Sequence, residues 1–154
     1  MSLGEENSDA LNSAVTNAYQ LGILTVVSAG NNGSDASRTS PASTPEAITV
    51  SAIGPDNTRP SWASFGPPID VFAPGIDVKS AFIGPNNNEA ATLSGTSMAA
   101  PHVAGLVLYL KSIDPVGNAK AADVTDTLKL ATAGVVINPG LNTANLLAYN
   151  GNGA

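Results

Sequence analysis

The sequence predicts an α/β domain built on a mostly parallel sheet. Three short, continuous apolar runs are rich in β-branched residues: GILTVVSAG at 22–30, AITVSAI at 47–53 and IDVFAP at 69–74. Runs of this length and composition are typical of strands that are buried on both faces, as in parallel sheets. A helical pattern precedes the first run, and a helix followed by a buried strand is part of the βαβ unit. We therefore expect one α/β domain over the 154 residues.

The helix expected before the first strand covers residues 8–21. Its apolar residues recur at spacings of three and four, which is the period of one helix face. They are Ala10, Leu11, Ala14, Val15, Ala18 and Leu21. Ser8 or Asp9 can cap the first turn, because a side-chain oxygen at that position accepts a backbone N–H that has no partner within the helix. Gly22 follows the last apolar residue, so the helix should end there.

The second half of the chain predicts a loop and two more helices. GPNNNEAAT at 84–92 reads as a surface loop. Residues 98–112 form a strongly apolar helix that should be central in the domain. NAKAADVTDTLKLAT at 118–132 predicts an outer helix with one apolar face, before a tail that ends in NLLAYNGNGA. The apolar residues of that face are Ala122, Val124, Leu128 and Ala131.

Charge and composition exclude several classes of function. Six Lys and Arg stand against 12 Asp and Glu, and the resulting net charge of -6 disfavours nucleic acid and anionic membranes as partners. The longest apolar runs, 22–27 and 103–110, are well short of the roughly 20 residues that span a bilayer. The absence of Cys excludes disulfides, a thiolate nucleophile and a Cys-based zinc site, and a single His excludes a cluster of His ligands.

Ser97 is the first candidate for catalysis. It lies in LSGTSMAAPHVAGL at 93–106, among small residues that allow a sharp turn and a close approach of other chain segments. A Ser hydroxyl is a weak nucleophile unless a base removes its proton. At a helix start the hydroxyl would sit beside N–H groups that can hold a developing oxyanion. The alternative is that Ser97 is simply a helix N-cap.

His102 does not form a local pair with Ser97. The two residues are five positions apart, so on a shared helix their side chains point about 140° away from each other. We therefore interpret His102 as a structural residue of the helix. A base for Ser97 has to come from elsewhere, and the sequence contains no other His.

Asn31 is the second candidate, because it follows the first predicted strand in SAGNNGSD. Polar side chains at the carboxyl ends of parallel strands are where open α/β sheets bind ligands. Its amide carries two N–H donors, which could stabilise an oxyanion. The alternative is a turn residue, since Asn and Gly are common in turns.

Taken together, three segments resemble the subtilase family of serine proteases, and most closely its proteinase K-like, fungal secreted branch. SGTSMAAPHVAGL at 94–106 resembles the nucleophile signature, VVSAGNNGSDASRTSPAS at 26–43 the oxyanion-asparagine segment, and MSLG at 1–4 the strand that binds the substrate backbone. The resemblance implies a three-layer subtilisin-like fold, of which residues 1–154 would be the C-terminal part.

The resemblance also implies roles for individual residues in peptide-bond hydrolysis. Ser97 would attack the scissile carbonyl, and Asn31 with the Ser97 N–H would hold the oxyanion. A peptide or protein substrate would pair with the cleft as an added β-strand. The residues lining that cleft would be Ser2, Leu3, Gly4, Ser28, Ala29 and Gly30. Glu5 departs from the second Gly that is usual in the family, and this places a charge beside the cleft.

A structural calcium site is implied by the same resemblance, whereas the chemistry itself requires no cofactor. The carbonyl groups of Pro45 and Ala47 and the carboxylate of Asp70 would surround the ion. Oxygen ligands of this kind suit Ca²⁺. The alternative is that Asp70 only makes a polar contact at a strand end.

The family's triad Asp and His precede the MSLG-like strand, and nothing in the 154 residues matches them. In subtilisin, loss of the triad His lowers kcat by about 10⁶, so the isolated chain is expected to be nearly inert. We consider three hypotheses: a piece of a longer subtilase, whose missing partner is the N-terminal half or a propeptide; a non-catalytic protein that binds peptides or a partner protease; and one half of a two-chain protease. By resemblance alone, the protein is expected to be extracellular, although its N-terminus has no secretory signal.

Overall fold

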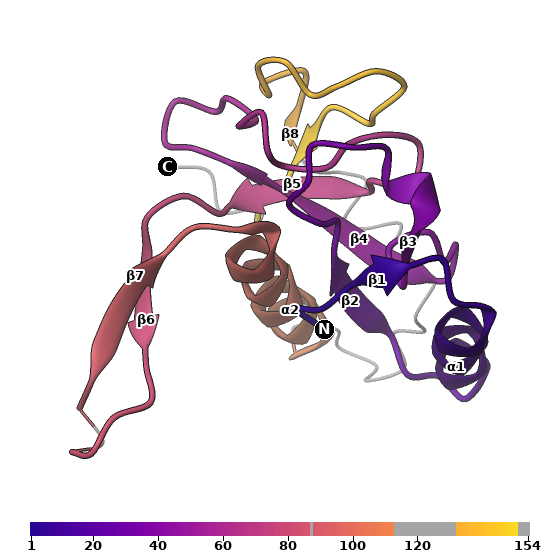
Figure 1. Ribbon diagram of the computed structural model, residues 1–154, viewed down its shortest axis with the longest axis horizontal. Helices are drawn as coiled ribbons and strands as arrows, with labels where there is room; N and C mark the ends of the chain where they lie inside the picture. Colours follow the sequence, from indigo (N-terminus) through magenta and orange to yellow (C-terminus); the bar gives the residue numbers. More distant parts are fainter. Residues whose placement is uncertain (87, 113–131, 151–154) are drawn as a thin grey trace.

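The structure is a computed structural model that describes residues 1–86, 88–112 and 132–150. Figure 1 shows a central sheet with helices packed against it, and one long hairpin that extends away from the body. The outer helix predicted at 118–132 lies almost entirely outside the described residues. In the described part of the chain, no helix is long and apolar enough to cross a membrane.

The five-stranded central sheet has the order β2-β4-β5-β9-β8. The three predicted strands form its core as β2 (Thr25–Ser28), β4 (Ala47–Ile53) and β5 (Val71–Pro74), and adjacent strands of this set are parallel. β9 (Leu146–Leu147) continues the parallel side, and β8 (Thr132–Ala133) pairs with it antiparallel. The mostly parallel sheet predicted from the sequence is thus confirmed.

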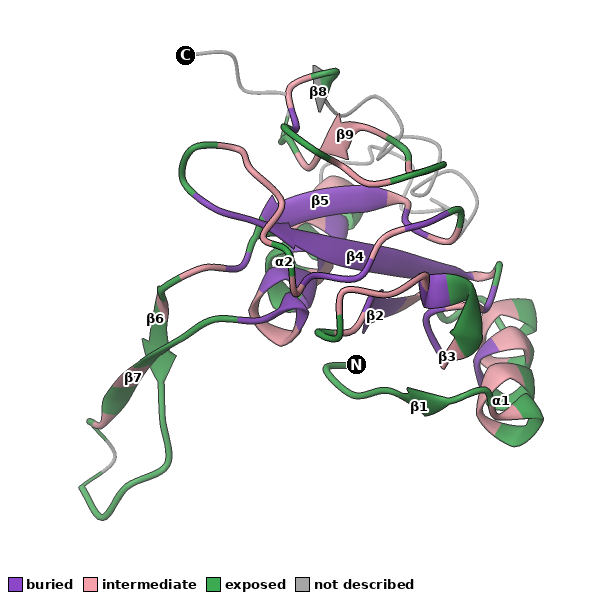
Figure 2. Cartoon of the chain, turned by 45° about the horizontal axis from the view of Figure 1, so that its top comes forward, coloured by how far each residue is buried: buried purple, intermediate pink, exposed green. Residues whose placement is uncertain are grey.

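Helices cover both faces of this sheet. Because side chains alternate between the two faces of each strand, neighbouring residues of one strand pack against different helices. Val26 faces α2 (Thr96–Ser112), whereas the next residue, Val27, packs with Val15 of α1 (Asp9–Gln20) on the opposite face. All seven residues of β4 are buried, which explains why its side chains are uncharged and why its two polar ones, Thr49 and Ser51, are hydrogen-bonded. The result is the three-layer arrangement, with the sheet in the middle (Figure 2).

The α1 helix begins as predicted, with Ser8 as its N-cap accepting from the Leu11 N–H. Between β2 and β4 the chain forms the short helix η1 (Ala36–Arg38) and the strand β3 (Thr39–Ser40). β3 pairs antiparallel with β1 (Glu5–Glu6). This pairing places the N-terminal segment beside the carboxyl end of β2.

The loop predicted at 84–92 is wrong in its last three residues, 90–92, which belong to a strand. β6 (Val78–Ala81) and β7 (Ala90–Leu93) form an antiparallel hairpin that projects from the body, and only its tip is a loop (Figure 1). Most of its residues are exposed. A strand without a buried face has no need of alternating apolar residues, so the sequence pattern gave no sign of it.

The central position predicted for the apolar helix is confirmed on one face only. Residues of α2 that pack on the sheet are buried, including Ala99, Val103 and Val107. The opposite face is open in the described structure: Leu108 is 70% exposed, and His102 is exposed too. This helix is therefore apolar on its outer side as well as on its core side.

Candidate functional site

Ser97 lies in the first turn of α2, above the carboxyl ends of β4 and β5. The chain reaches this position through a close approach of two glycines, where the Gly95 N–H donates to the Gly75 carbonyl at 2.8 Å. A Cβ on Gly75 would lie 2.6 Å from the Ala52 Cβ and 2.8 Å from the Gly95 oxygen. Small residues are therefore required here to seat the helix start on the sheet. Ser97 itself is partly exposed.

Asn31 is tied directly to the residue that precedes Ser97. Its Oδ1 accepts from the Thr96 N–H and from the Thr96 hydroxyl, both at 2.9 Å. These bonds occupy the oxygen of the amide, so the Nδ2 donors are left to face the other way. The Asn31 Nδ2 lies beside Gly95, 3.3 Å from where a Cβ on that residue would stand.

Thr96 is the residue that sequence reasoning missed. It is fully buried, and its hydroxyl also accepts from the Gly30 N–H at 3.2 Å while it donates to Asn31. One hydroxyl therefore fixes both the end of β2 and the amide of Asn31. The signal in the sequence was a Thr beside a candidate nucleophile, which by itself is too common to assign.

The Ser97 backbone N–H has no acceptor within the described residues. It belongs to the first turn of α2, where backbone donors lack a partner in the preceding turn. Asn31 and Ser97 thus offer a side-chain donor and a backbone donor from two segments that Thr96 holds together. Donors of these two kinds are able to stabilise an oxyanion.

A hollow of about 620 Å³ opens beside Ser97 and gathers most of the residues predicted to bind substrate. The predicted residues that line it are Ser2, Leu3, Gly4, Ser28, Gly30, Asn31 and Ser97. The Ser2 hydroxyl donates to the Ser97 carbonyl at 2.8 Å, which ties the N-terminal segment to the start of α2. Ala29 is not among the lining residues: it is fully buried, and its N–H donates to Val50.

His102 and Ser97 share no hydrogen bond in the structure. The His102 Nδ1 lies 2.8 Å from the Met98 carbonyl, one helical turn before it, so that nitrogen is a donor to the helix backbone. Both residues also line a second, smaller hollow of about 310 Å³ between α2 and β6. In agreement with the helical geometry, no base within the described residues is hydrogen-bonded to the Ser97 hydroxyl.

The predicted calcium ligands lie at the amino ends of two neighbouring parallel strands. Ala47 begins β4, with Pro45 two residues before it, and Asp70 immediately precedes β5. The Thr49 N–H donates to the Asp70 Oδ2 at 2.7 Å, and the Asp70 N–H donates back to the Thr49 carbonyl. These residues offer only oxygen atoms, which fits a hard cation. No group of three or more His, Cys, Asp or Glu residues gathers anywhere in the described parts, and the predicted site itself contains a single carboxylate.

Comparison with known proteins decides the family. The profile described as "Subtilase family" matches residues 1–153. This chain belongs to the subtilase family. The chain is 55% identical over 153 residues to a subtilisin-like proteinase, Mp1, of Magnaporthiopsis poae. It is 52% identical to alkaline protease 1 of Aspergillus flavus. The alignments cover 98% and 99% of this chain but 37% of each relative, so the subtilase chain spans well under half the length of these proteins.

The fold of this subtilase chain matches solved structures of proteases. A cold-adapted subtilisin-like serine proteinase is similar with a TM-score of 0.89 and 39% identity, over 97% of this chain and 53% of the solved one. A protease from Pseudoalteromonas arctica is similar with a TM-score of 0.85 and 27% identity, over 96% of this chain and 47% of the other. The incomplete subtilisin-like α/β fold predicted from the sequence is confirmed.

Proposed function

We propose that this chain forms the nucleophile-bearing and oxyanion-binding part of a serine endopeptidase. The observation that carries the proposal is the link between Asn31 and the start of α2. Thr96 occupies the Asn31 oxygen, which leaves the amide donors of Asn31 and the Ser97 N–H on two residues that line the same hollow. In this proposal, the residues lining the large hollow hold the substrate peptide. The protein acts on extracellular peptides or proteins, as its resemblance to secreted subtilases implies.

Hydrolysis in this proposal begins when the Ser97 Oγ attacks the carbonyl carbon of the scissile bond. The hydroxyl proton passes to a base, and the carbonyl oxygen gains a negative charge that Asn31 Nδ2 and the Ser97 N–H stabilise. The base returns the proton to the leaving amine, and water then releases the acyl group from Ser97. His102 does not serve as this base, because it shares no hydrogen bond with Ser97 and, five positions further along the same helix, its side chain points about 140° away. The base comes from polypeptide other than these 154 residues.

Labelling of Ser97 tests this proposal. The segment of the Aspergillus flavus relative that precedes the matched region would be joined to Met1, giving a full-length chimera. We expect a fluorophosphonate probe to label the chimera at Ser97, because the added segment completes the site, and to label the 154-residue chain far more slowly. Ser97→Ala should abolish the label without changing the fold, as judged by circular dichroism.

Absence of label on Ser97 in a folded chimera would contradict the proposal. The competing function is then a peptide-binding subtilase-like protein without catalysis. The observation that favours it is the lack of any bond between Ser97 and the only His of the chain. Fluorescence anisotropy would measure the affinity of the 154-residue chain for peptides. It would show whether the chain binds peptides without cleaving them or does not bind them at all.

We further propose that Pro45, Ala47 and Asp70 hold a structural Ca²⁺. The support is the position of Asp70 beside the start of β4, where backbone carbonyl groups and a carboxylate come from adjacent strands. A bound cation stabilises the folded state by mass action, since the unfolded chain lacks the site. The ion would have no part in the chemistry at Ser97, which lies at the opposite ends of these strands.

Chelation of calcium should lower the melting temperature of the chimera. At free Ca²⁺ 100 times above Kd, the ion stabilises the fold by about 2.7 kcal/mol, so excess EDTA should lower the Tm by several degrees. Asp70→Asn should reduce this difference, while Asp56→Asn, a carboxylate on another loop, should keep it. Differential scanning calorimetry would measure the effect, and an identical Tm with and without EDTA in the parent protein would refute the site.

A further inference from the structure

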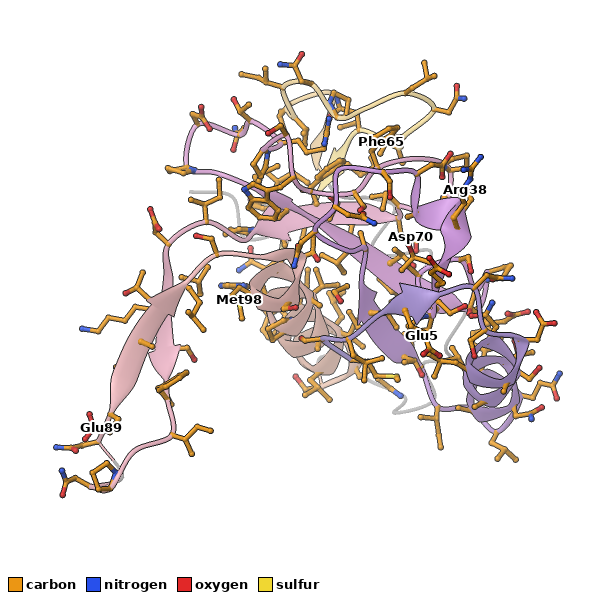
Figure 3. The ribbon with its side chains drawn as sticks, in the orientation of Figure 1. Glu5, Arg38, Phe65, Asp70, Glu89 and Met98 are labelled. Atoms are coloured by element: carbon orange, nitrogen blue, oxygen red, sulfur yellow. The ribbon has the colours of Figure 1, made fainter. Side chains whose placement is uncertain are left out.

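Charged side chains occupy one end of the hollow beside Ser97. Of the residues that line it, Glu5, Glu6 and Arg38 carry charge. Glu5 and Glu6 form β1, and Arg38 ends η1 just before the β3 strand that pairs with β1. Figure 3 shows Glu5 and Arg38 on the same side of the molecule, while Glu89 lies at the far tip of the hairpin. The charges are thus concentrated where the N-terminal segment crosses the mouth of the hollow.

Among the residues that line the hollow, Arg38 carries the one positive side chain, and the carboxylate of Asp35 feels its charge. The pKa of Asp35 is held below its ordinary value, first by the Ser37 N–H and hydroxyl and also by the charge of Arg38. Asp35 is therefore ionised and lies within the field of Arg38. By contrast, both glutamates are exposed, and neither forms an ion pair with any described residue. The Glu5–Glu6 end of the hollow therefore has an excess of negative charge.

We propose that Glu5 and Glu6 make this cleft select peptides that carry a Lys or Arg side chain at the β1 end of the hollow. This inference rests on the proposed function, because it assumes that the hollow holds the substrate peptide. Two carboxylates attract a cationic side chain through water-exposed space, which strengthens binding modestly and weakens with salt. They also repel Asp and Glu side chains, so an acidic peptide lacks the attraction and is repelled as well.

The solvent exposure of Glu5 and Glu6 sets the size of the expected preference for Lys. Carboxylates at the mouth of a solvated hollow interact with a ligand charge through a high dielectric. We expect a Lys peptide to bind roughly five-fold more tightly than its norleucine counterpart at low ionic strength. Because the screening length shrinks from about 10 Å at 0.1 M salt to about 3 Å at 1 M, the preference should disappear in concentrated NaCl.

The test measures the affinity of the full 154-residue chain for fluorescent hexapeptides by anisotropy. Lys, norleucine and Glu would be placed at each position in turn, at 50 mM and 1 M NaCl. The preference for Lys should fall mainly in the single variant, E5Q or E6Q, whose carboxylate faces the bound side chain, and it should vanish in the double variant. Successive strand residues project to opposite sides, so the single variants show which carboxylate acts. E89Q removes the same charge at the hairpin tip and should leave the preference unchanged.

Two results would overturn the inference, and they differ in what they say about the proposed function. Equal affinity for Lys and norleucine peptides at every position, with binding intact, removes the charge selection but leaves the hollow as a peptide site. Absence of binding by all peptides removes the hollow as a peptide site in this chain. Labelling of Ser97 in the chimera then decides separately whether the proposed catalytic role stands.

Discussion

Asn31→Leu in the full-length chimera should lower kcat for peptide hydrolysis by about 10²–10³-fold and leave KM nearly unchanged. The magnitude is the one measured for loss of this type of donor in subtilisin, a member of the same family. The physical reason lies in the contacts of Asn31: its oxygen is bound twice by Thr96, so its donors remain for a charge that exists only during the reaction. An interaction made only in the transition state changes kcat rather than substrate binding.

The hydroxyl of Thr96 provides a matched control for this effect. Thr96→Ser keeps the hydroxyl and should retain most of the activity. Thr96→Val removes the hydroxyl's bonds to Asn31 and Gly30, leaves only the backbone N–H on the Asn31 oxygen, and should lower kcat. Steady-state kinetics on a peptide nitroanilide would measure all three variants. A rise in KM with an unchanged kcat in Asn31→Leu would show instead that Asn31 holds the ground-state peptide.

Residues with a strong local signature could be identified from the sequence. The three buried strands were predictable because continuous apolar runs of β-branched residues have few alternative structures, and β4 matches its predicted bounds of 47–53. Ser97 and Asn31 were predictable as candidates because each sits where a fold of this class places ligands. Their proximity was not predictable from spacing, since 65 residues separate Asn31 from Thr96 and only the parallel sheet brings them together.

What the sequence left open depends on contacts between distant segments. The role of Thr96 depends on two hydrogen bonds across the sheet end, which no local pattern encodes. The β6–β7 hairpin was missed because exposed strands lack the buried face from which strands are recognised. The start of α2 differs from the predicted one for a related reason. α2 begins at Thr96 rather than at residue 98, because its first backbone N–H is satisfied by the side chain of Asn31.

Phe72→Ala should destabilise the protein by about 3–5 kcal/mol, the usual cost of truncating a buried Phe. Phe72 has the largest fully buried side chain among the described residues. It lies on the face of β5 that points away from α2, where it fills the space between the sheet and the segments at 29–42 and 135–136. Truncation leaves a cavity there, and the rigid strand can collapse into it only partly.

This cavity should also reach the site. Ala29, which precedes Gly30 and Asn31, belongs to the same packed cluster as Phe72. Loss of the ring should therefore loosen the end of β2 from which Asn31 projects. Urea unfolding of the chimera, followed by circular dichroism, would measure the stability, with Phe72→Leu as a milder control that keeps most of the volume.

The two effects of Phe72→Ala can be separated by temperature. A loss of 3–5 kcal/mol is a large fraction of the about 5–15 kcal/mol that stabilises a typical domain, so Phe72→Ala should be assayed well below its lowered Tm. If the folded variant keeps the parental kcat there, the cluster stabilises the domain without positioning Asn31. If kcat falls while the protein remains folded, the packing beneath β2 also sets the geometry of the oxyanion donors, which is the outcome that the shared cluster predicts.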